Sequence, residues 1–326
     1  MPLRTIHKLS FAVLALAVFL PGTRADEHPV TLKEAYGKLF DIGVALPGKG
    51  MTDAEEQLVV DQFTTLTTEN CLKFDHVHPA ENTFSFEQGD SLVAFAQKYH
   101  LKVNGHTLVY RQPRPDWFFD DQGKPAARDL VLSRMRKHIA VVAGHYKGKL
   151  DNNDYGIEIP SKREKALRLV RDLRDHGARV DGIGIQGHWE TGKVPCQDIE
   201  DAIVAFHQAG LEVMITELDL DVVPRKIKGA DASKTETTMS DPYANGCPPE
   251  ILQQQASDYA KLFRLFRKHA DKITRVTFWN LHDGRSWLNS WPRKRTNHPL
   301  LWDRQLQPKP AFATVMAVAA EPPPAK

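Results

Sequence analysis

The sequence predicts an α/β fold of the (β/α)8 barrel type, in which helices cover a parallel sheet. Short runs rich in β-branched residues alternate with segments whose apolar residues recur at helical spacing. The chain has 326 residues, of which 41% are hydrophobic, so it can form one barrel-sized core. A doubly wound open sheet is the alternative. No Gly-rich phosphate loop follows any strand, which disfavours its dinucleotide-binding form.

The first 25 residues have the pattern of a secretory signal peptide. A basic start with Arg4 and Lys8 precedes the apolar run Leu9–Leu20, and the segment ends on the small residue Ala25. The apolar run is too short to span a bilayer as a helix. We therefore expect cleavage near Ala25, rather than an uncleaved anchor, and a secreted or periplasmic mature protein.

The charge balance argues against a nucleic-acid partner. The chain carries 43 basic and 41 acidic residues, a net charge of +2. Removal of residues 1–25 takes away three basic residues and no acidic one, so the mature net charge becomes −1. A nucleic-acid-binding protein would carry a clustered basic surplus. The mean hydropathy of −0.42 excludes an integral membrane protein, so we expect no membrane partner either.

Seven strands are expected, each a short run rich in apolar and β-branched residues. Seven is one fewer than the eight strands of a complete barrel. In chain order the expected strands are Phe40–Ala45, Thr65–Phe74, Lys102–Val109, Lys149–Tyr155, Val180–Gln186, Glu212–Leu218 and Arg275–Asn280.

Helices are expected between these strands, because apolar residues there recur at i, i+3, i+4 and i+7. The clearest stripes are Leu92, Phe95, Ala96 and Tyr99; Ala166, Leu169, Val170 and Leu173; and Ala256, Tyr259, Ala260, Phe263 and Phe266.

The mature chain is predicted to be one domain over residues 26–320. The polar segment Pro224–Glu250 follows a strand and precedes a helix, so it is interpreted as a loop. The Pro-rich tail, residues 321–326, is predicted to be disordered. The three cysteines have no paired spacing for zinc or redox chemistry. In an exported protein Cys196 and Cys247 could pair, which would leave Cys71 as a thiol.

Polar residues at the carboxyl ends of barrel strands are candidates for function. The run from Val213 to Asp219 leads an apolar strand into Glu217. A rigidly held, ionised carboxylate at such a place suits a glycosidase nucleophile. A structural ion pair is the competing interpretation.

Other strand ends carry residues that could support such a carboxylate or bind a sugar. His188 could orient a neighbouring carboxylate, or be a structural histidine. Glu69, Asn70 and Lys73 offer the mixed acceptors and donors that sugar hydroxyls need, or form a polar turn. His106 lies in the run Gly105–Tyr110, which is another candidate of this kind. Tryptophans 279 and 287 suit a platform for the apolar face of a sugar, or core packing.

The ordered set of these motifs resembles the family 10 glycoside hydrolases, the retaining endo-1,4-β-xylanases. The resemblance runs from about Leu32 to Phe312. It implies a barrel that cleaves xylan without a metal or organic cofactor. It implies that Glu217 is the nucleophile and that His188 orients it. The implied substrate-binding residues are Glu69, Asn70, Lys73, His106, Tyr110, Gln186, Trp279 and Trp287.

One motif of the family is missing. In the family, the fourth strand carries Trp-Asp-Val-Val-Asn-Glu, and its Glu is the general acid/base. No similar motif occurs in this sequence. The helix Ala127–Tyr146 leads through residues that precede strand four in the family. The following segment, 150–155, resembles strand five, so one β/α unit is predicted to be absent. Asp151 is the predicted substitute acid/base.

The loss matters chemically, because retaining hydrolysis needs two carboxyl groups about 5–5.5 Å apart. Three hypotheses follow. The chain is an exported, monomeric xylanase-like hydrolase of weakened activity, a xylan-binding pseudoenzyme without turnover, or the defective product of a deletion.

Overall fold

The computed structural model describes residues 31–109, 115–146, 153–154, 156–227, 230–231, 233–237 and 241–323. The predicted signal peptide and two predicted site residues, Tyr110 and Asp151, lie outside the described residues.

A parallel sheet forms the centre of the molecule, with its strands in the order β3-β2-β1-β10-β9-β7-β6. Each neighbour in this order is also the next barrel strand along the chain, with β10 returning to β1, as in a (β/α)8 barrel. The strands are β1 (Asp41–Leu46), β2 (Thr65–Thr68), β3 (Lys102–Asn104), β6 (Asn153–Asp154), β7 (Gly182–Ile185), β9 (Glu212–Asp221) and β10 (Ile273–Phe278).

The sheet is an incomplete barrel, because its two end strands, β3 and β6, do not pair with each other among the described residues. The fold-class prediction, including its seven strands, is therefore confirmed. A further short strand, β8 (His188–Glu190), pairs with the end of β9. A separate hairpin joins β4 (Asp120–Asp121) to β5 (Lys124–Pro125).

Two expected strands end well before their predicted carboxyl ends. The run predicted to start at Thr65 leaves the sheet after Thr68, because a turn at Glu69 leads into the short helix α3 (Phe74–Val77). The run predicted to start at Lys102 ends at Asn104. Beyond β2, Cys71, Leu72 and Phe74 are buried outside the sheet, whereas Val109 beyond β3 is exposed. By contrast, β9 extends three residues beyond its predicted end at Leu218 because β8 pairs with it.

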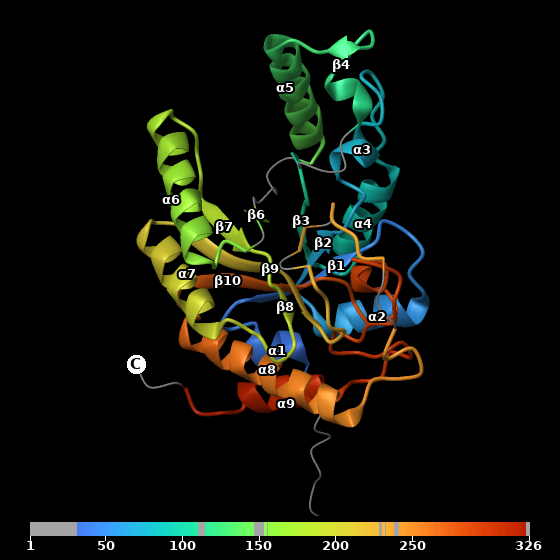
Figure 1. The fold of residues 1–326 in the computed structure, drawn as a ribbon, viewed down its shortest axis with the longest axis vertical. Coiled ribbons are helices and arrows are strands. Elements are labelled where there is room, and N and C mark those ends of the chain that lie inside the picture. The colour runs from blue at the N-terminus through green and yellow to red at the C-terminus, as the bar shows by residue number, and fades with distance from the viewer. Residues whose placement is uncertain are drawn as a thin grey trace, which may run out of the picture. The chain divides into compact units, whose positions relative to one another are not determined.

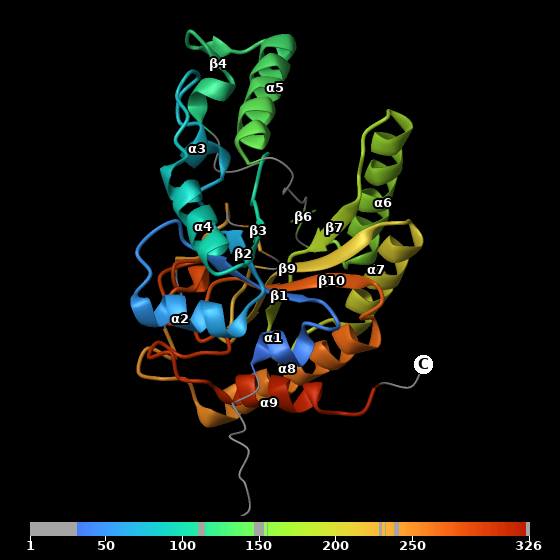
Figure 2. The same ribbon diagram turned by 180° about the vertical axis from the view of Figure 1, so that it is seen from behind.

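Helices surround the sheet (Figures 1 and 2). Thr52 and Glu55 form a capping box that starts α2, since each side chain accepts a bond from the other residue's backbone N–H. The helices are α1 (Leu32–Tyr36), α2 (Asp53–Gln62), α4 (Glu87–Lys98), α5 (Arg128–His145), α6 (Pro160–Asp175), α7 (Cys196–Gln208), α8 (Pro249–Lys268) and α9 (Pro310–Ala319). Two 3₁₀ turns span Asp116–Phe118 and Trp287–Asn289.

The densest part of the core lies where α1, α8 and α9 meet β1 and β10. The Tyr36 and Phe263 rings pack edge to face with centroids 4.9 Å apart, and Phe263 stacks on Phe278 of β10. The Tyr36 hydroxyl donates to the carbonyl of Val315 at 2.6 Å, which joins α1 to α9. All the predicted apolar residues of α8 are buried here.

The predicted apolar stripe of α6 is only partly buried. Val170 is buried, whereas Leu169 is 56% exposed and Leu173 is 38% exposed. This helix follows β6, an end strand of the sheet, so one flank has no neighbouring helix among the described residues. The stripe predicts the helix correctly, but two of its four residues, Leu169 and Leu173, stay exposed.

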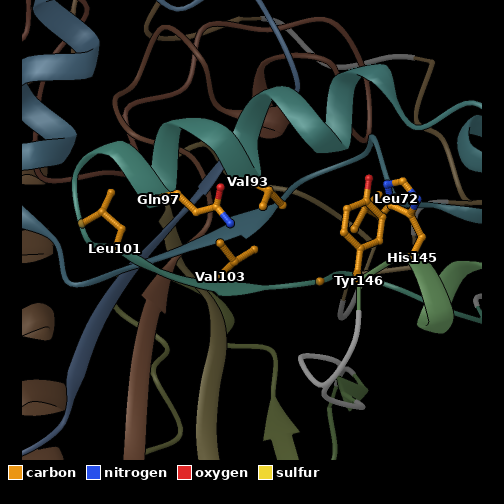
Figure 3. A pocket seen from close by; sticks show the side chains of 8 residues that line it. Leu72, Val93, Gln97, Leu101, Val103, His145 and Tyr146 are labelled. Carbon is orange, nitrogen blue, oxygen red and sulfur yellow. The ribbon is translucent and has the colours of Figure 1, made fainter.

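The other end of the sheet borders an apolar hollow of about 270 Å³ (Figure 3). Val93 and Gln97 of α4 point toward Val103 of β3, and His145 and Tyr146 close the hollow from the end of α5. No residue of the predicted site lines it.

The cysteines are free thiols, so Cys196 and Cys247 do not pair in this structure. Glu321, where the predicted tail begins, accepts hydrogen bonds from Arg264 of α8. Among the described residues, no helix is both long and apolar enough to cross a membrane.

Candidate functional site

A buried chain of ionisable groups lies at the carboxyl end of β9. Glu217 and Asp219 are two residues apart on this strand, so their side chains share one face. His188 lies between them, with Nε2 2.9 Å from Glu217 Oε2 and Nδ1 3.0 Å from Asp219 Oδ2. The side chains of His188 and Glu217 are 4% and 5% exposed, so this contact is shielded from water.

A tight turn between β7 and β8 places His188 against Glu217. Gly187 adopts φ of 91°, which favours glycine, and a Cβ there would lie 3.2 Å from the Ile215 side chain. The Glu217 amide donates to the Gln186 carbonyl at 2.6 Å, which joins β9 to this turn.

The surrounding charges keep Glu217 ionised. Burial alone would raise the pKa of Glu217, but the hydrogen bond from His188 and the charges of His106, His188 and Lys73 together lower it below its ordinary value. Burial opposes protonation of His188, yet Asp219 and Glu217 raise its pKa to about 9. Near neutral pH His188 is therefore a cation between two carboxylates. Glu217 Oε1 is buried and has no hydrogen-bond partner among the described residues, so it is available to attack.

The turn after β2 brings a second polar group to the same place. Lys73 Nζ donates to Asn70 Oδ1 at 2.8 Å. Burial lowers the pKa of Lys73, although the negative charges of Glu217 and Glu69 act to raise it. Burial also raises the pKa of Glu69, although Asn280, the charge of Lys73 and Asn70 act to lower it. Glu69, Asn70 and Lys73 therefore form one cluster close to Glu217.

Aromatic rings complete this side of the site. The His106 and Trp279 rings pack edge to face at 5.1 Å, and the Trp287 ring lies 4.8 Å from His188. Trp287 Nε1 donates to Asp219 Oδ2 at 2.8 Å, which fixes the indole. Trp279 is buried, whereas Trp287 is partly exposed and can present its face to a ligand.

The structure thus gathers Glu217, His188, Glu69, Asn70, Lys73, His106, Trp279 and Trp287, and the Gln186 carbonyl accepts from the Glu217 amide beside them. Tyr110 and Asp151 lie outside the described residues.

Two contributors had no assigned role in the sequence analysis. Asp219 holds both His188 and Trp287, and strand alternation after Glu217 could have identified it. Asn280 Oδ1 accepts from the Trp287 backbone amide at 3.0 Å, and the Asn280 side chain acts to lower the pKa of Glu69. Its φ of 82° is unusual for a residue other than glycine, and no sequence signal marks it.

Other carboxylates described around this site have partners of their own. Glu190 pairs with Lys193 at 2.8 Å, and Glu158 accepts from Trp189 Nε1 at 3.1 Å. Because Trp189 follows His188 on a strand, their side chains point to opposite faces. No hydrogen bond or ion pair joins Glu158 or Glu190 to Glu217 among the described residues. Nor do the described residues contain a group of three or more side chains placed to hold a metal ion.

The sequence model of glycosyl hydrolase family 10 matches this chain over residues 31–152 and 149–318. The two matched stretches meet where one β/α unit is predicted to be absent. Endo-1,4-beta-xylanase A of Xylanibacter ruminicola is 32% identical over 366 aligned residues, covering 95% of this chain and 99% of the relative. That alignment is 40 positions longer than the 326 residues of this chain, so parts of the relative have no counterpart here.

Other relatives agree. The beta-1,4-xylanase of Dictyoglomus thermophilum is 33% identical over 86% of this chain and 89% of the relative. The crystal structure of xylanase XynB from Paenibacillus barcinonensis superimposes with a TM-score of 0.79 at 32% identity, covering 90% of this chain and 99% of that one. A GH10 endoxylanase retrieved from sugarcane soil metagenome gives a TM-score of 0.82 at 28% identity, covering 89% of this chain and 99% of that one.

Proposed function

This chain belongs to glycosyl hydrolase family 10, and from that membership we propose that it cleaves internal β-1,4-xylosidic bonds of xylan by retaining double displacement. The observation that carries this proposal is the buried contact of Glu217 with His188. It supplies an ionised carboxylate with one unpartnered oxygen, as the nucleophile of such a reaction requires.

In the first step, Glu217 Oε1 attacks the anomeric carbon, and the bond to the leaving oxygen breaks. The other oxygen, Oε2, stays hydrogen-bonded to His188, whose orientation is fixed by Asp219. Positioning residues for the sugar on the non-reducing side are Glu69, Asn70, Lys73, His106, Trp279 and Trp287. Tyr110 and Gln186 belong to the same proposed set.

In the second step, water displaces Glu217 and restores the original anomeric configuration. Both steps normally use a second carboxyl group, first as an acid and then as a base. We propose that the family's acid/base glutamate is missing here, and that Asp151 is its nearest substitute. Three observations support the proposal: the open edges of β3 and β6, the family match in two stretches, and the longer alignment to the relatives.

The expected cost is large, because acid–base assistance contributes about 10²–10⁴-fold to rate. That factor is about 3–5 kcal/mol of activation free energy. A xylan-binding pseudoenzyme is the alternative, favoured by the sugar-binding residues that remain around Glu217. We also propose export after cleavage near Ala25, on the pattern of residues 1–25.

A stopped-flow time course with dinitrophenyl β-xylobioside tests the proposal, because this leaving group needs no proton. A burst of about one equivalent followed by a stall is expected from a working nucleophile without its base. Steady turnover would indicate that a substitute such as Asp151 acts. The Glu217→Ala variant is the control and should show no burst. No release from the unmodified protein would overturn the proposed hydrolysis, and calorimetry with xylobiose would then test the binding alternative.

A further inference from the structure

Two buried histidines outside the candidate site, His78 and His138, face each other. His78 directly follows α3, His138 lies on α5, and both residues are fully buried. Their Nδ1 atoms are 3.2 Å apart, their ring planes differ by 3° and the ring centroids are 5.4 Å apart. The two rings therefore meet edge to edge in nearly one plane.

The outer nitrogen of each ring contacts a backbone carbonyl. His78 Nε2 lies 3.1 Å from the Glu81 oxygen, and His138 Nε2 lies 2.7 Å from the Leu108 oxygen. A carbonyl oxygen only accepts hydrogen bonds, so both Nε2 atoms must carry a proton to make these two bonds. Two neutral imidazoles hold only two such protons, so their Nδ1 atoms would then face each other as bare lone pairs.

The three contacts are complete only when the pair binds one extra proton. One ring is then an imidazolium, and its Nδ1–H donates to the Nδ1 of the other ring. A second extra proton would place two N–H groups against each other, with no acceptor between them, and the rings would have to separate. The closed pair thus holds at most one extra proton, whereas two separated rings in water can take two.

The surroundings of the pair disfavour protonation. Phe84 stacks on His78 with centroids 3.8 Å apart, and Phe74 stacks on His138 at 3.9 Å, so these ring faces are shielded from water. Burial lowers the pKa of His78, and it lowers the pKa of His138 to about 4. Near neutral pH the closed pair is therefore uncharged.

Two charged groups act on His78, and neither outweighs burial. The Lys137 ammonium on α5 lowers its pKa, and the Glu81 carboxylate raises it. Glu81 is already held by Arg134, which donates to it through Nε at 2.7 Å and Nη2 at 3.1 Å. No carboxylate bonds to either histidine ring among the described residues.

The pair connects α5 to two segments that carry predicted site residues. His78 ends α3, which begins directly after Lys73. The Leu108 carbonyl, which accepts from His138, lies two residues after His106. Separation of the two rings would therefore release α5 from the segments that follow β2 and β3.

We propose that His78 and His138 form an acid-sensitive switch, which holds α5 against α3 and the segment after β3 near neutral pH and opens when both rings are protonated. The open form binds at least one more proton than the closed form, so acid favours opening. The stabilisation is complete above about pH 6.5 and is lost as the pH falls toward 4. The switch is independent of the proposed hydrolysis, because neither histidine belongs to the proposed sugar site.

Hydrogen exchange followed by mass spectrometry tests the switch on the unmodified protein. Protection factors, which correct for the intrinsic effect of pH on exchange, are compared at pH 7.5 and pH 5. Helix α8, which contains no histidine, is the internal reference. Protection of α5 should fall by at least about tenfold relative to α8, because the open form takes up an additional proton below about pH 6.5.

His138→Gln and His78→Gln are the decisive variants. The glutamine amide N–H can replace Nε2 as the donor to the backbone carbonyl, and its oxygen can accept from the Nδ1–H of the remaining histidine. That histidine can then bind its proton without leaving its partner, so the acid-dependent loss of α5 protection should disappear. His145→Gln is the matched control on the same helix, because its ring is 37% exposed and bonds to Asp90 instead. It should keep the loss of at least about tenfold.

Each outcome decides for or against the switch. Full protection of α5 at pH 5 in the unmodified protein overturns it, and this result needs no variant. An equal acid-dependent loss in the unmodified protein and in a folded His138→Gln or His78→Gln variant also overturns it. Circular dichroism at pH 7.5 identifies which variants fold, and one folded variant is enough for this comparison.

Discussion

Helices α8 and α6 carry the same kind of apolar stripe but differ in what covers it. In α8, Tyr259, Phe263 and Phe266 are all fully buried against the sheet and α9. In α6, Leu169 and Leu173 remain exposed next to the buried Val170. Figures 1 and 2 show α8 beside α9 and α1, and α6 beside β7 and α7 at one edge of the molecule.

The difference follows from the order of the strands. The strand before α8, β9, has paired neighbours on both sides, whereas β6, before α6, is an end strand. The side of the sheet at β9 and β10, called the packed side here, holds Glu217, His188 and Trp287. The side at β6 and α6, called the open side, ends the sheet among the described residues. The lesson is that local periodicity determines a helix, while burial of its stripe depends on the neighbouring unit.

Azide should restore turnover if the packed side is intact and only the open side lacks its carboxylate. Azide attacks the anomeric carbon of the glycosyl ester, the ester bond breaks, and Glu217 leaves as a carboxylate, so no base is needed. With dinitrophenyl β-xylobioside, the steady rate should rise by about 10²–10⁴-fold, the usual contribution of the missing group. Nuclear magnetic resonance should identify β-xylobiosyl azide. Steady release of dinitrophenol without azide, with xylobiose as the only sugar product, would contradict this contrast between the packed and open sides.

Phe263→Ala should destabilise the packed side by about 3–5 kcal/mol, because it deletes a fully buried ring and leaves a cavity. Urea unfolding followed by circular dichroism measures the change. A loss below about 1 kcal/mol would mean that this part of the core is loosely packed.

Raising the pH should lower the free energy of unfolding, because His188 on the packed side loses its proton. Its pKa is about 9 in the folded protein and about 6.5 when unfolded, so its contribution is complete below pH 6.5 and is lost as the pH rises through 9. The difference amounts to at most about 3 kcal/mol. Unfolding midpoints at pH 6.5 and pH 9.5 should show the loss. The His188→Gln variant should show a flatter dependence over the same interval, and an equal slope would remove His188 as the cause.

Leu169→Ala on the open side should change the free energy of unfolding by less than about 0.5 kcal/mol, because the side chain is mostly in water. It is the matched counterpart of Phe263→Ala and is measured in the same way. A loss of about 2 kcal/mol or more would show that another surface covers α6 in solution, and the contrast between the helices would fail.

The sequence alone predicted much of this molecule, because the signals involved are local. The apolar runs of β1, β7, β9 and β10 and the periodicity of α4, α6 and α8 depend on residues a few positions apart. The ordered motifs around Glu217, His188 and Trp287 also indicated which residues to look for. The absence of the fourth-strand motif could be noticed from the sequence because each β/α unit is a separate segment.

Only the tertiary structure decided which residues support and surround Glu217. The Asp219–His188–Glu217 chain and the contact of Asn280 with Glu69 join residues far apart in the sequence. The buried pair of His78 and His138 likewise depends on α3 and α5 meeting. Burial of Phe263 and exposure of Leu169 differ for the same reason. The sequence determines the period of a helix, but its environment depends on which distant segments pack against it.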